Sequence, residues 1–139
     1  MGGNAARLVL LSAFAMALAA CGSSSKTAPE TEPNIVPTDY KNEILQAMTS
    51  ALDDPSNIRE AYISDPVLTQ LDLSQRYTAC VRFNARDLAR NYVGSKDRIA
   101  YFFGGHLNQL VEATKEQCGK AAYKPFPELE KLCLANKCN

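Results

Sequence analysis

The feature that most constrains the fold of this chain is an apolar segment near its start. Leu8 to Ala20 form a run of thirteen residues that only Ser12 interrupts, and the one charge before it is Arg7. A helix needs about 20 apolar residues to cross the hydrocarbon of a bilayer, so this run is too short to be a span. A basic start and a short apolar core before small residues are typical of a secretory signal. The sequence therefore predicts that residues 1–20 are a signal peptide and that the fold is built from the remainder.

The apolar segment ends in Leu18-Ala19-Ala20-Cys21, and Gly22 follows. This motif resembles the lipobox of bacterial lipoproteins, whose cysteine receives diacylglycerol and, after cleavage, a further acyl chain such as palmitate. The resemblance implies that Cys21 is lipidated and that the protein is anchored on the periplasmic side of the outer membrane, since glycine rather than aspartate follows the cysteine. Two or more acyl chains anchor a protein stably, whereas one holds it only marginally. The alternative is an ordinary secretory cleavage site with a spare thiol.

The segment after Cys21 has the composition of a tether. Residues 22–38 read GSSSKTAPETEPNIVPT, which holds three prolines, three serines and few residues that a core could bury. Such a composition is typical of linkers. We therefore assign residues 21–38 to the lipidated cysteine and its tether, with an ordered N-terminal arm as the alternative, and residues 39–139 to a single periplasmic domain.

The remaining cysteines are even in number. Setting Cys21 aside leaves four of the five: Cys80, Cys118, Cys133 and Cys138. An even count in an exported chain predicts disulfides, and four cysteines allow three connectivities. We favour Cys80–Cys118 with Cys133–Cys138, because Asn136 tolerates the left-handed conformation that lets the chain double back after a helix.

A zinc site is the alternative use of these cysteines. The chain has no Cys-x-x-Cys pair, and its single histidine is His106, so the spacing argues against a metal site. No sequence motif calls for a cofactor.

Periodicity predicts an α+β domain. Apolar residues at helical spacing predict a helix over 39–53, with Lys41, Asn42, Glu43 and Gln46 on its wet side and Pro55 ending it. A turn over 53–57, a strand over 58–64, an irregular segment over 66–75 and a strand over 76–85 follow, the last because RYTACVRFNA alternates. A polar excursion over 86–97, a strand over 98–103 and a Gly104-Gly105 turn complete the pattern.

The segment from His106 to Ala121 fits two structures. A strand is expected after a Gly-Gly turn, yet the apolar spacing also suits a helix; we favour a strand to about Glu112 and then a helical turn. Pro127 suits the first turn of a short C-terminal helix. The predicted architecture is an N-terminal helix packed on a small antiparallel meander, with a short C-terminal helix.

Two stretches resemble a family of small uncharacterised proteobacterial proteins, many of them exported. They are ALDDPSN at residues 51–57 and CVRFNAR at 80–86, which runs on to Asn91-Tyr92-Val93-Gly94. The resemblance implies a small α+β domain and no known activity. The family has two glycines where Arg90 and Asn91 stand, and Asn91 is the residue better able to take a positive φ there.

Charge is unevenly distributed over the domain. Residues 39–75 carry two basic and seven acidic side chains, whereas residues 76–98 carry six basic and two acidic ones. Either the two regions compensate each other, or the basic run meets an anionic partner such as an envelope protein, lipopolysaccharide or peptidoglycan. The candidate partner-binding residues are Arg82, Arg86, Arg90, Asn91 and Tyr92. Nucleic acid is not expected as a partner, because the chain is exported and carries no net charge.

Few residues suggest catalysis. His106 sits beside a turn, where histidines are commonly exposed, and Asp53 and Asp54 precede a proline, where capping the turn is their simpler role. The sequence predicts no catalytic residues, hence a non-catalytic binding or structural accessory module. The alternative is a small inhibitor or enzyme that acts on a cell-wall substrate.

Overall fold

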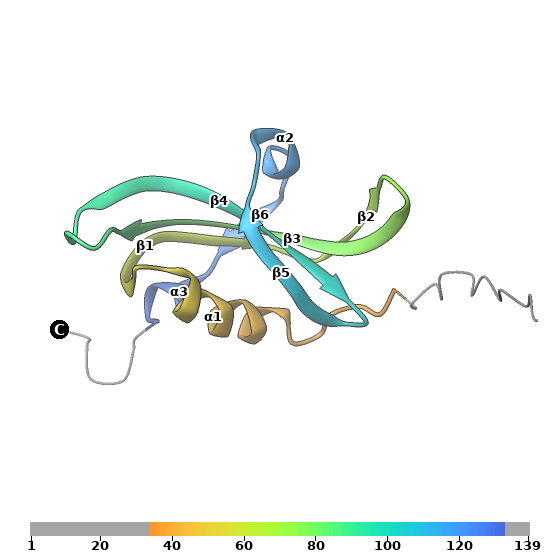
Figure 1. The fold of residues 1–139 in the computed structure, drawn as a ribbon, viewed down its shortest axis with the longest axis horizontal. Helices are drawn as coiled ribbons and strands as arrows, with labels where there is room; N and C mark the ends of the chain where they lie inside the picture. The colour runs from red at the N-terminus through yellow and green to blue at the C-terminus, as the bar shows by residue number, and fades with distance from the viewer. Residues whose placement is uncertain (1–33, 133–139) are drawn as a thin grey trace, which may run out of the picture. The chain divides into compact units, whose positions relative to one another are not determined.

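The computed structural model describes residues 34–132, which form an antiparallel sheet with three short helices (Figure 1). The elements are α1 (Tyr40–Ala51), β1 (Asp54–Ser64), β2 (Val67–Leu71), β3 (Ser74–Arg86), β4 (Tyr92–Phe103), β5 (His106–Glu112), α2 (Lys115–Cys118), β6 (Tyr123–Pro125) and α3 (Pro127–Glu130). The strand order is β5-β4-β3-β1-β6, and β2 also pairs with β3. The predicted α+β class with an antiparallel sheet is confirmed.

The long strand β3 organises the sheet. Its first half pairs with β2, from Ser74 opposite Leu71 to Thr78 opposite Val67, and its second half pairs with β1. Asp65 and Pro66 separate β1 from β2, because proline has no backbone N–H to donate to a neighbouring strand. The prediction of an irregular segment over 66–75 is therefore wrong: β2 and β3 form a hairpin closed by two residues, which the weak pattern VLTQL did not indicate.

The strand predicted from the alternation in RYTACVRFNA is confirmed as part of β3. Ala79, Val81 and Phe83 are buried in the main core, while Cys80 on the opposite face belongs to a second core. The predicted polar excursion over 86–97 is partly wrong, because β4 already begins at Tyr92. The first half of β4 is mostly exposed, so its sequence has no alternation of apolar and polar residues that would predict a strand.

The helix and the segment after it also differ from the prediction in detail. Helix α1 covers Tyr40–Ala51 with Ile44 and Met48 buried. The predicted turn over 53–57 is wrong, since β1 begins at Asp54 and includes Pro55. Positive φ angles at Asn57 and Glu60 accompany register shifts against β3, so β1 enters the sheet irregularly.

The later elements agree with the sequence. Gly104 and Gly105 have positive φ angles in the β4–β5 turn, and the favoured strand to Glu112 followed by a helical turn is confirmed as β5 and α2. Pro127 opens α3, as expected for a residue without an N–H to satisfy.

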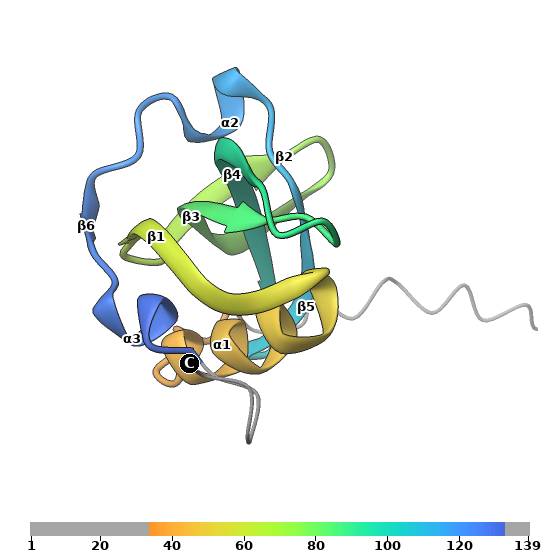
Figure 2. The ribbon, with the colours of Figure 1, turned by 90° about the vertical axis from the view of Figure 1, so that its left-hand side faces the viewer.

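The sheet carries side chains packed on both faces. Figures 1 and 2 show α1 and α3 on one side and α2 on the other. The main core joins Ile44 and Met48 to residues of β1, β3 and β4, and to Phe126 and Leu129 near α3. The second core is Cys80, Ile99 and Cys118, so it is small. The packing of so few side chains contributes little stability, and the two cysteines of this core provide an additional link.

Candidate functional site

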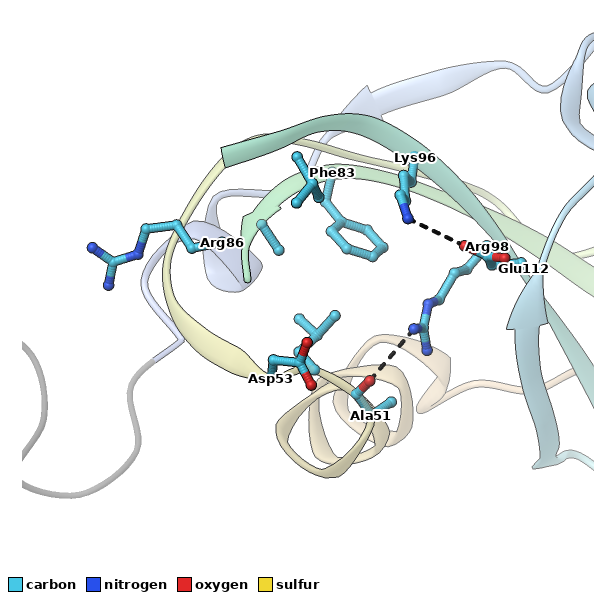
Figure 3. Close-up of a pocket in the computed structure, with 10 residues that line it drawn as sticks. Ala51, Asp53, Phe83, Arg86, Lys96, Arg98 and Glu112 are labelled. Carbon is cyan, nitrogen blue, oxygen red and sulfur yellow. Dashed lines mark hydrogen bonds and ion pairs between the residues drawn. The ribbon is translucent and has the colours of Figure 1, made fainter. Parts of the chain in front are cut away.

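A cleft of about 170 Å³ opens between the end of α1 and strands β3 and β4 (Figure 3). Ten residues line it: Ala51, Leu52, Asp53, Phe83, Ala85, Arg86, Val93, Lys96, Arg98 and Glu112. Four separate stretches of the chain therefore meet at this place. The register of β3 and β4 brings two of these stretches together, because Phe83 lies opposite Lys96 in the β3–β4 pair.

Arg98 links the sheet to the end of the helix. Its Nη2 donates a hydrogen bond of 3.4 Å to the carbonyl of Ala51, and its guanidinium lies 6.0 Å from the centre of the Phe83 ring. The last turn of α1 has no basic residue of its own. A cation beside the free carbonyls at a helix C-terminus is favourable, so Arg98 completes that end of α1 from a neighbouring strand.

Lys96 contributes a cation with more freedom. Its Nζ lies 3.5 Å from Glu112 Oε1, and the two side chains are 52% and 70% exposed. An exposed ion pair contributes little to stability. Separating Lys96 from Glu112 so that either of them binds a ligand therefore costs little free energy. Asp53 lies at the helix side of the same cleft (Figure 3). The cleft thus offers both cations and carboxylates around an apolar wall.

The apolar wall is formed by Leu52, Phe83, Ala85 and Val93. Small-molecule sites are commonly 300–1,000 Å³, so a cleft of about 170 Å³ suits a chain end or a side group rather than a whole cofactor. A shallower hollow of about 340 Å³ adjoins it through Lys96 and Glu112 and is also lined by Ser95, Asp97, Ala113 and Lys115. A longer ligand can therefore continue past the edge of β4.

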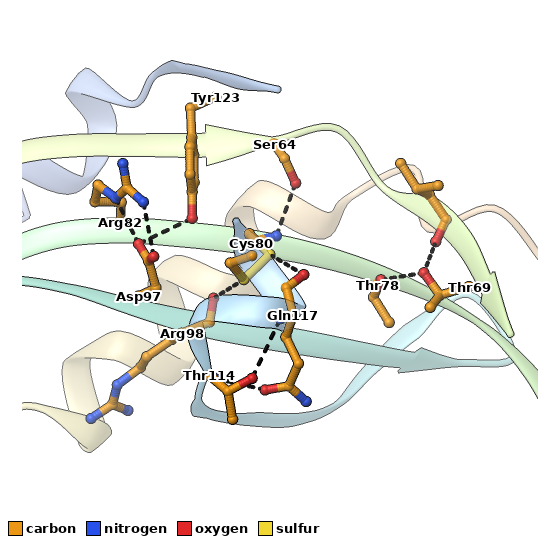
Figure 4. The surroundings of a disulfide bond; sticks show 12 residues. Ser64, Thr69, Thr78, Cys80, Arg82, Asp97, Arg98, Thr114, Gln117 and Tyr123 are labelled. Atoms are coloured by element: carbon orange, nitrogen blue, oxygen red, sulfur yellow. Dashed lines mark hydrogen bonds and ion pairs between the residues drawn. A yellow bond between two sulfur atoms is a disulfide. The ribbon is translucent and has the colours of Figure 1, made fainter. Parts of the chain in front are cut away.

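Arg82, one of the predicted partner-binding residues, is held within the domain. It donates to both carboxylate oxygens of Asp97, at 2.7 and 2.9 Å, and its guanidinium lies 4.5 Å from the centre of the Tyr123 ring (Figure 4). The hydrogen bonds from Arg82 hold the pKa of the Asp97 carboxyl below its ordinary value. Burial, and then the hydrogen bond of 3.1 Å to Asp97, raise the pKa of Tyr123 to about 12. This cluster attaches the segment around β6 to the sheet.

Arg86 has internal partners too. Its Nη2 lies 2.7 Å from Asp54 Oδ2 and 3.2 Å from Ser56 Oγ. Hydrogen bonds from Ser56, followed by the charge of Arg86, lower the pKa of Asp54. Compensation between the acidic and basic regions, one of the two interpretations of the charge pattern, therefore describes Arg86, whereas Arg82 is neutralised by Asp97 within the basic region itself.

The other three predicted residues lie in the turn between β3 and β4 and at the first position of β4. Arg90 has a φ of 64°, so the expectation that Asn91 takes the positive φ is wrong. The backbone N–H of Asn91 donates to Asp87 Oδ1 at 2.9 Å, and the left-handed position lies one residue earlier, at Arg90. The Tyr92 hydroxyl donates to the Asn57 carbonyl at 2.7 Å. Of these residues, Arg90 is exposed and has no ion-pair partner among residues 34–132.

The structure contains the disulfide Cys80–Cys118, one of the two favoured pairs, with a Cα–Cα distance of 5.8 Å (Figure 4). It joins β3 to α2 in the second core, where Tyr101 and Tyr123 pack around it. The predicted lipidation site Cys21 and the predicted pair Cys133–Cys138 lie outside the described residues.

His106 is 82% exposed, and its Nδ1 lies 2.8 Å from Glu43 Oε1. The other oxygen of Glu43 accepts a hydrogen bond from the Leu107 amide. Glu43 was expected on the wet side of the helix, yet it is 22% exposed and fastens β5 to α1. Both groups thus have a structural role in the β5 edge.

Sequence reasoning had counted Lys96 and Arg98 among the basic residues without separating them from Arg82 and Arg86. The signal was their alternation: Lys96 and Arg98 lie two residues apart and share the face of Phe83, whereas Arg82 lies on the other face. Asp53 and Glu112 carried no such signal, because only the fold brings them to the same cleft.

Comparisons with family models, with curated proteins and with solved structures found no match. Within residues 34–132, no helix has the length and apolar character needed to cross a bilayer. No group of three or more histidine, cysteine, aspartate or glutamate side chains in this described part is placed to hold a metal ion.

Proposed function

We propose that this protein is a lipoprotein of the outer membrane, anchored by acylated Cys21 and facing the periplasm, that binds an envelope polymer without catalysing a reaction. The Leu-Ala-Ala-Cys motif supports the anchor, and the disulfide Cys80–Cys118 supports an oxidising compartment. The proposal takes residues 22–33 as the tether and counts residues 34–38 with the binding domain, because Pro37 is buried and Ile35 lies beside Gly105.

The observation that carries the binding role is the cleft beside α1. Lys96 and Arg98 offer donors to a carboxylate, while Asp53 and Glu112 offer acceptors to an ammonium group, and Phe83 provides an apolar wall. Charge-assisted hydrogen bonds of these kinds are stronger than neutral ones. The matching ligand is the end of a short peptide that carries a free carboxylate and a free amine, as the stem peptides of peptidoglycan do.

The cleft depends on the position of α1. In this proposal α1 is the helix packed on the antiparallel meander, which the burial of Ile44 and Met48 in the main core supports. The hydrogen bond from Arg98 to Ala51 and the contact of Glu43 with Leu107 hold the two ends of the helix.

Binding rather than reaction fits the residues that line the cleft. They include no serine, cysteine or histidine, and Lys96 lies in an exposed ion pair with Glu112, whereas a nucleophilic lysine is activated by desolvation. Glu112 lies 3.5 Å from the Lys96 Nζ, and Asp53 is a second carboxylate of the cleft lining, which suits recognition of charge.

Titration of the chain from Gly22 with a purified peptidoglycan stem peptide, followed by calorimetry, tests the binding role. We expect Lys96→Gln to weaken binding by about ten- to hundredfold, the equivalent of one charge-assisted hydrogen bond of about 1.5–3 kcal/mol. The matched control Lys120→Gln removes an exposed lysine elsewhere and leaves the affinity unchanged. A stem peptide with blocked carboxylate and amine groups should not bind.

Equal affinities for wild type, the Lys96 variant and the blocked peptide would rule out recognition at this cleft. Mass spectrometry of the native protein tests the anchor separately. A free Cys21 thiol in the mature protein would contradict lipidation.

A further inference from the structure

Six of the ten large apolar side chains that are exposed in the described domain lie on three neighbouring segments. These are the chain before α1, the β2–β3 hairpin and the end of β4, and the side chains are Ile35, Val36, Val67, Leu68, Leu73 and Phe103. Leu73, at the tip of the hairpin, is fully exposed. Apolar groups gathered in this way mark an interaction surface more often than single exposed residues do.

Contacts join the three segments into one surface, which we call the hairpin end. The Arg76 guanidinium of the β2–β3 hairpin lies 4.8 Å from the centre of the Phe103 ring. A Cβ at Gly105, two residues further on, would stand 2.9 Å from Ile35 Cγ2, so the start of the described chain passes directly beside the β4–β5 turn. Figure 1 shows the β2–β3 hairpin, the β4–β5 turn and the orange start of the chain at the same end of the sheet.

The hairpin end is apolar with little charge. From Val67 to Thr78 the chain carries one acidic residue, Asp72, and one basic residue, Arg76. An anionic polymer would be recognised by a cluster of free cations, which this segment does not present. The interface of a bilayer instead accepts apolar and aromatic side chains together with the aliphatic part of arginine.

The start of this surface is close in sequence to the proposed anchor. The described chain starts at Asn34 on the hairpin end, and residues 22–33 separate it from Cys21. Twelve residues of linker composition span roughly 20 Å. An acylated Cys21 would therefore hold the hairpin end within reach of the membrane surface.

We propose that the hairpin end rests on the bilayer, with Leu73 and Phe103 in the interfacial region, and that the cleft faces away from the membrane. Strand β3 runs from the hairpin to the turn that carries Leu88, and its 13 residues separate the two by up to about 40 Å along the strand. The cleft residues Phe83 and Ala85 belong to the distant half of β3. This orientation rests on the membrane anchor of the proposed function and leaves the ligand of the cleft open.

Tryptophan fluorescence can test the orientation, because the natural chain contains no tryptophan. Leu73→Trp and the matched control Leu88→Trp each place one fluorophore at an exposed turn, on opposite ends of β3. The lipidated protein is reconstituted in vesicles of phosphatidylethanolamine and phosphatidylglycerol, with and without brominated phosphatidylcholine. We expect a blue-shifted emission and bromine quenching for the Leu73 variant alone.

A second arm separates the surface from the anchor. The chain from Gly22 carries an N-terminal hexahistidine segment and is held on vesicles by a nickel-chelating lipid, so its outcome does not depend on Cys21. Without that lipid, Leu73→Asp should lower vesicle co-sedimentation by about tenfold, the size expected for losing one large apolar side chain from the interface. Leu88→Asp should leave it unchanged.

Three results would overturn the orientation. The first is that the Leu73 variant is not quenched on either anchor, and the second is that both tryptophan variants are quenched equally. The third is that the emission of the Leu73 variant shifts to the blue only when a purified envelope protein is present. The last result would assign the hairpin end to a protein partner. None of these results would bear on stem-peptide binding, which the Lys96 titration measures.

Discussion

Replacing Cys80 and Cys118 together with alanine removes the covalent link between β3 and α2. The two cysteines are 38 positions apart, and closing a loop of that length stabilises a domain by about 4 kcal/mol through the lower entropy of the unfolded chain. The folded state loses packing as well, because these two residues and Ile99 are the buried members of the second core. A typical domain is stable by only 5–15 kcal/mol, so the loss is large.

Urea unfolding measured by circular dichroism gives the magnitude. With a urea dependence of about 1 kcal/mol per molar for a domain of this size, the midpoint should fall by about 3–4 M. Hydrogen exchange gives the location. Cys118 is the one buried residue of the four-residue helix α2. The backbone amides of α2 should therefore lose protection from exchange before those of β3.

A second double variant serves as the control. Cys133→Ala with Cys138→Ala also removes two thiols, but a disulfide between them would close only a short loop and contribute about 2 kcal/mol. The reasoning is refuted if the Cys80 and Cys118 double variant unfolds within about 1 kcal/mol of the wild type. Packing of Tyr101 and Tyr123 would then be sufficient to hold α2.

Three further perturbations follow from the structure. Arg90→Gly should raise the free energy of unfolding by about 0.5–1 kcal/mol in urea, because Arg90 has a φ of 64°, whereas Asn91→Gly should lower it; the reverse order would contradict the turn. Asp97→Asn should move the spectrophotometric pKa of Tyr123 from about 12 toward 10. Because the pKa of Asp97 is lowered in the folded state, its contribution is present above the unfolded pKa near 4 and disappears as pH falls through the folded value. The Asn variant should therefore show a flatter loss of thermal stability in acid, and an unchanged acid limb would refute this. Gly105→Ala should cost about 1–2 kcal/mol, since φ is 84° and the new Cβ meets the segment before α1; a thermal midpoint equal to the wild type would refute that contact.

Local patterns explain which elements could be predicted. The alternation in RYTACVRFNA predicted the strand that became the centre of the sheet, because one face of β3 meets the main core. The Gly104-Gly105 turn and Pro127 at the start of α3 follow from backbone conformations that few other residues favour. Strand β2 and the first half of β4 escaped prediction, since strands whose two faces are both largely exposed have no apolar period.

The cleft could not be predicted for a different reason. Its charged residues come from positions 53, 86, 96, 98 and 112; strand alternation relates positions 96 and 98, but no sequence spacing relates this pair to the other three. Likewise, the sequence left open whether Arg82 and Arg86 are neutralised or free, and the strand register gave them Asp97 and Asp54 as partners.

The sequence by itself determined the expected signal peptide, the expected lipidation at Cys21, the even set of remaining cysteines and the elements with strong local periodicity. The tertiary structure alone decided which charges are neutralised, which residues line the cleft, and that six of the exposed apolar residues gather at the hairpin end. The physical reason is distance. Backbone preference and apolar period act between residues close in sequence, whereas ion pairs and clefts depend on side chains within a few ångströms of each other, whatever their separation along the chain.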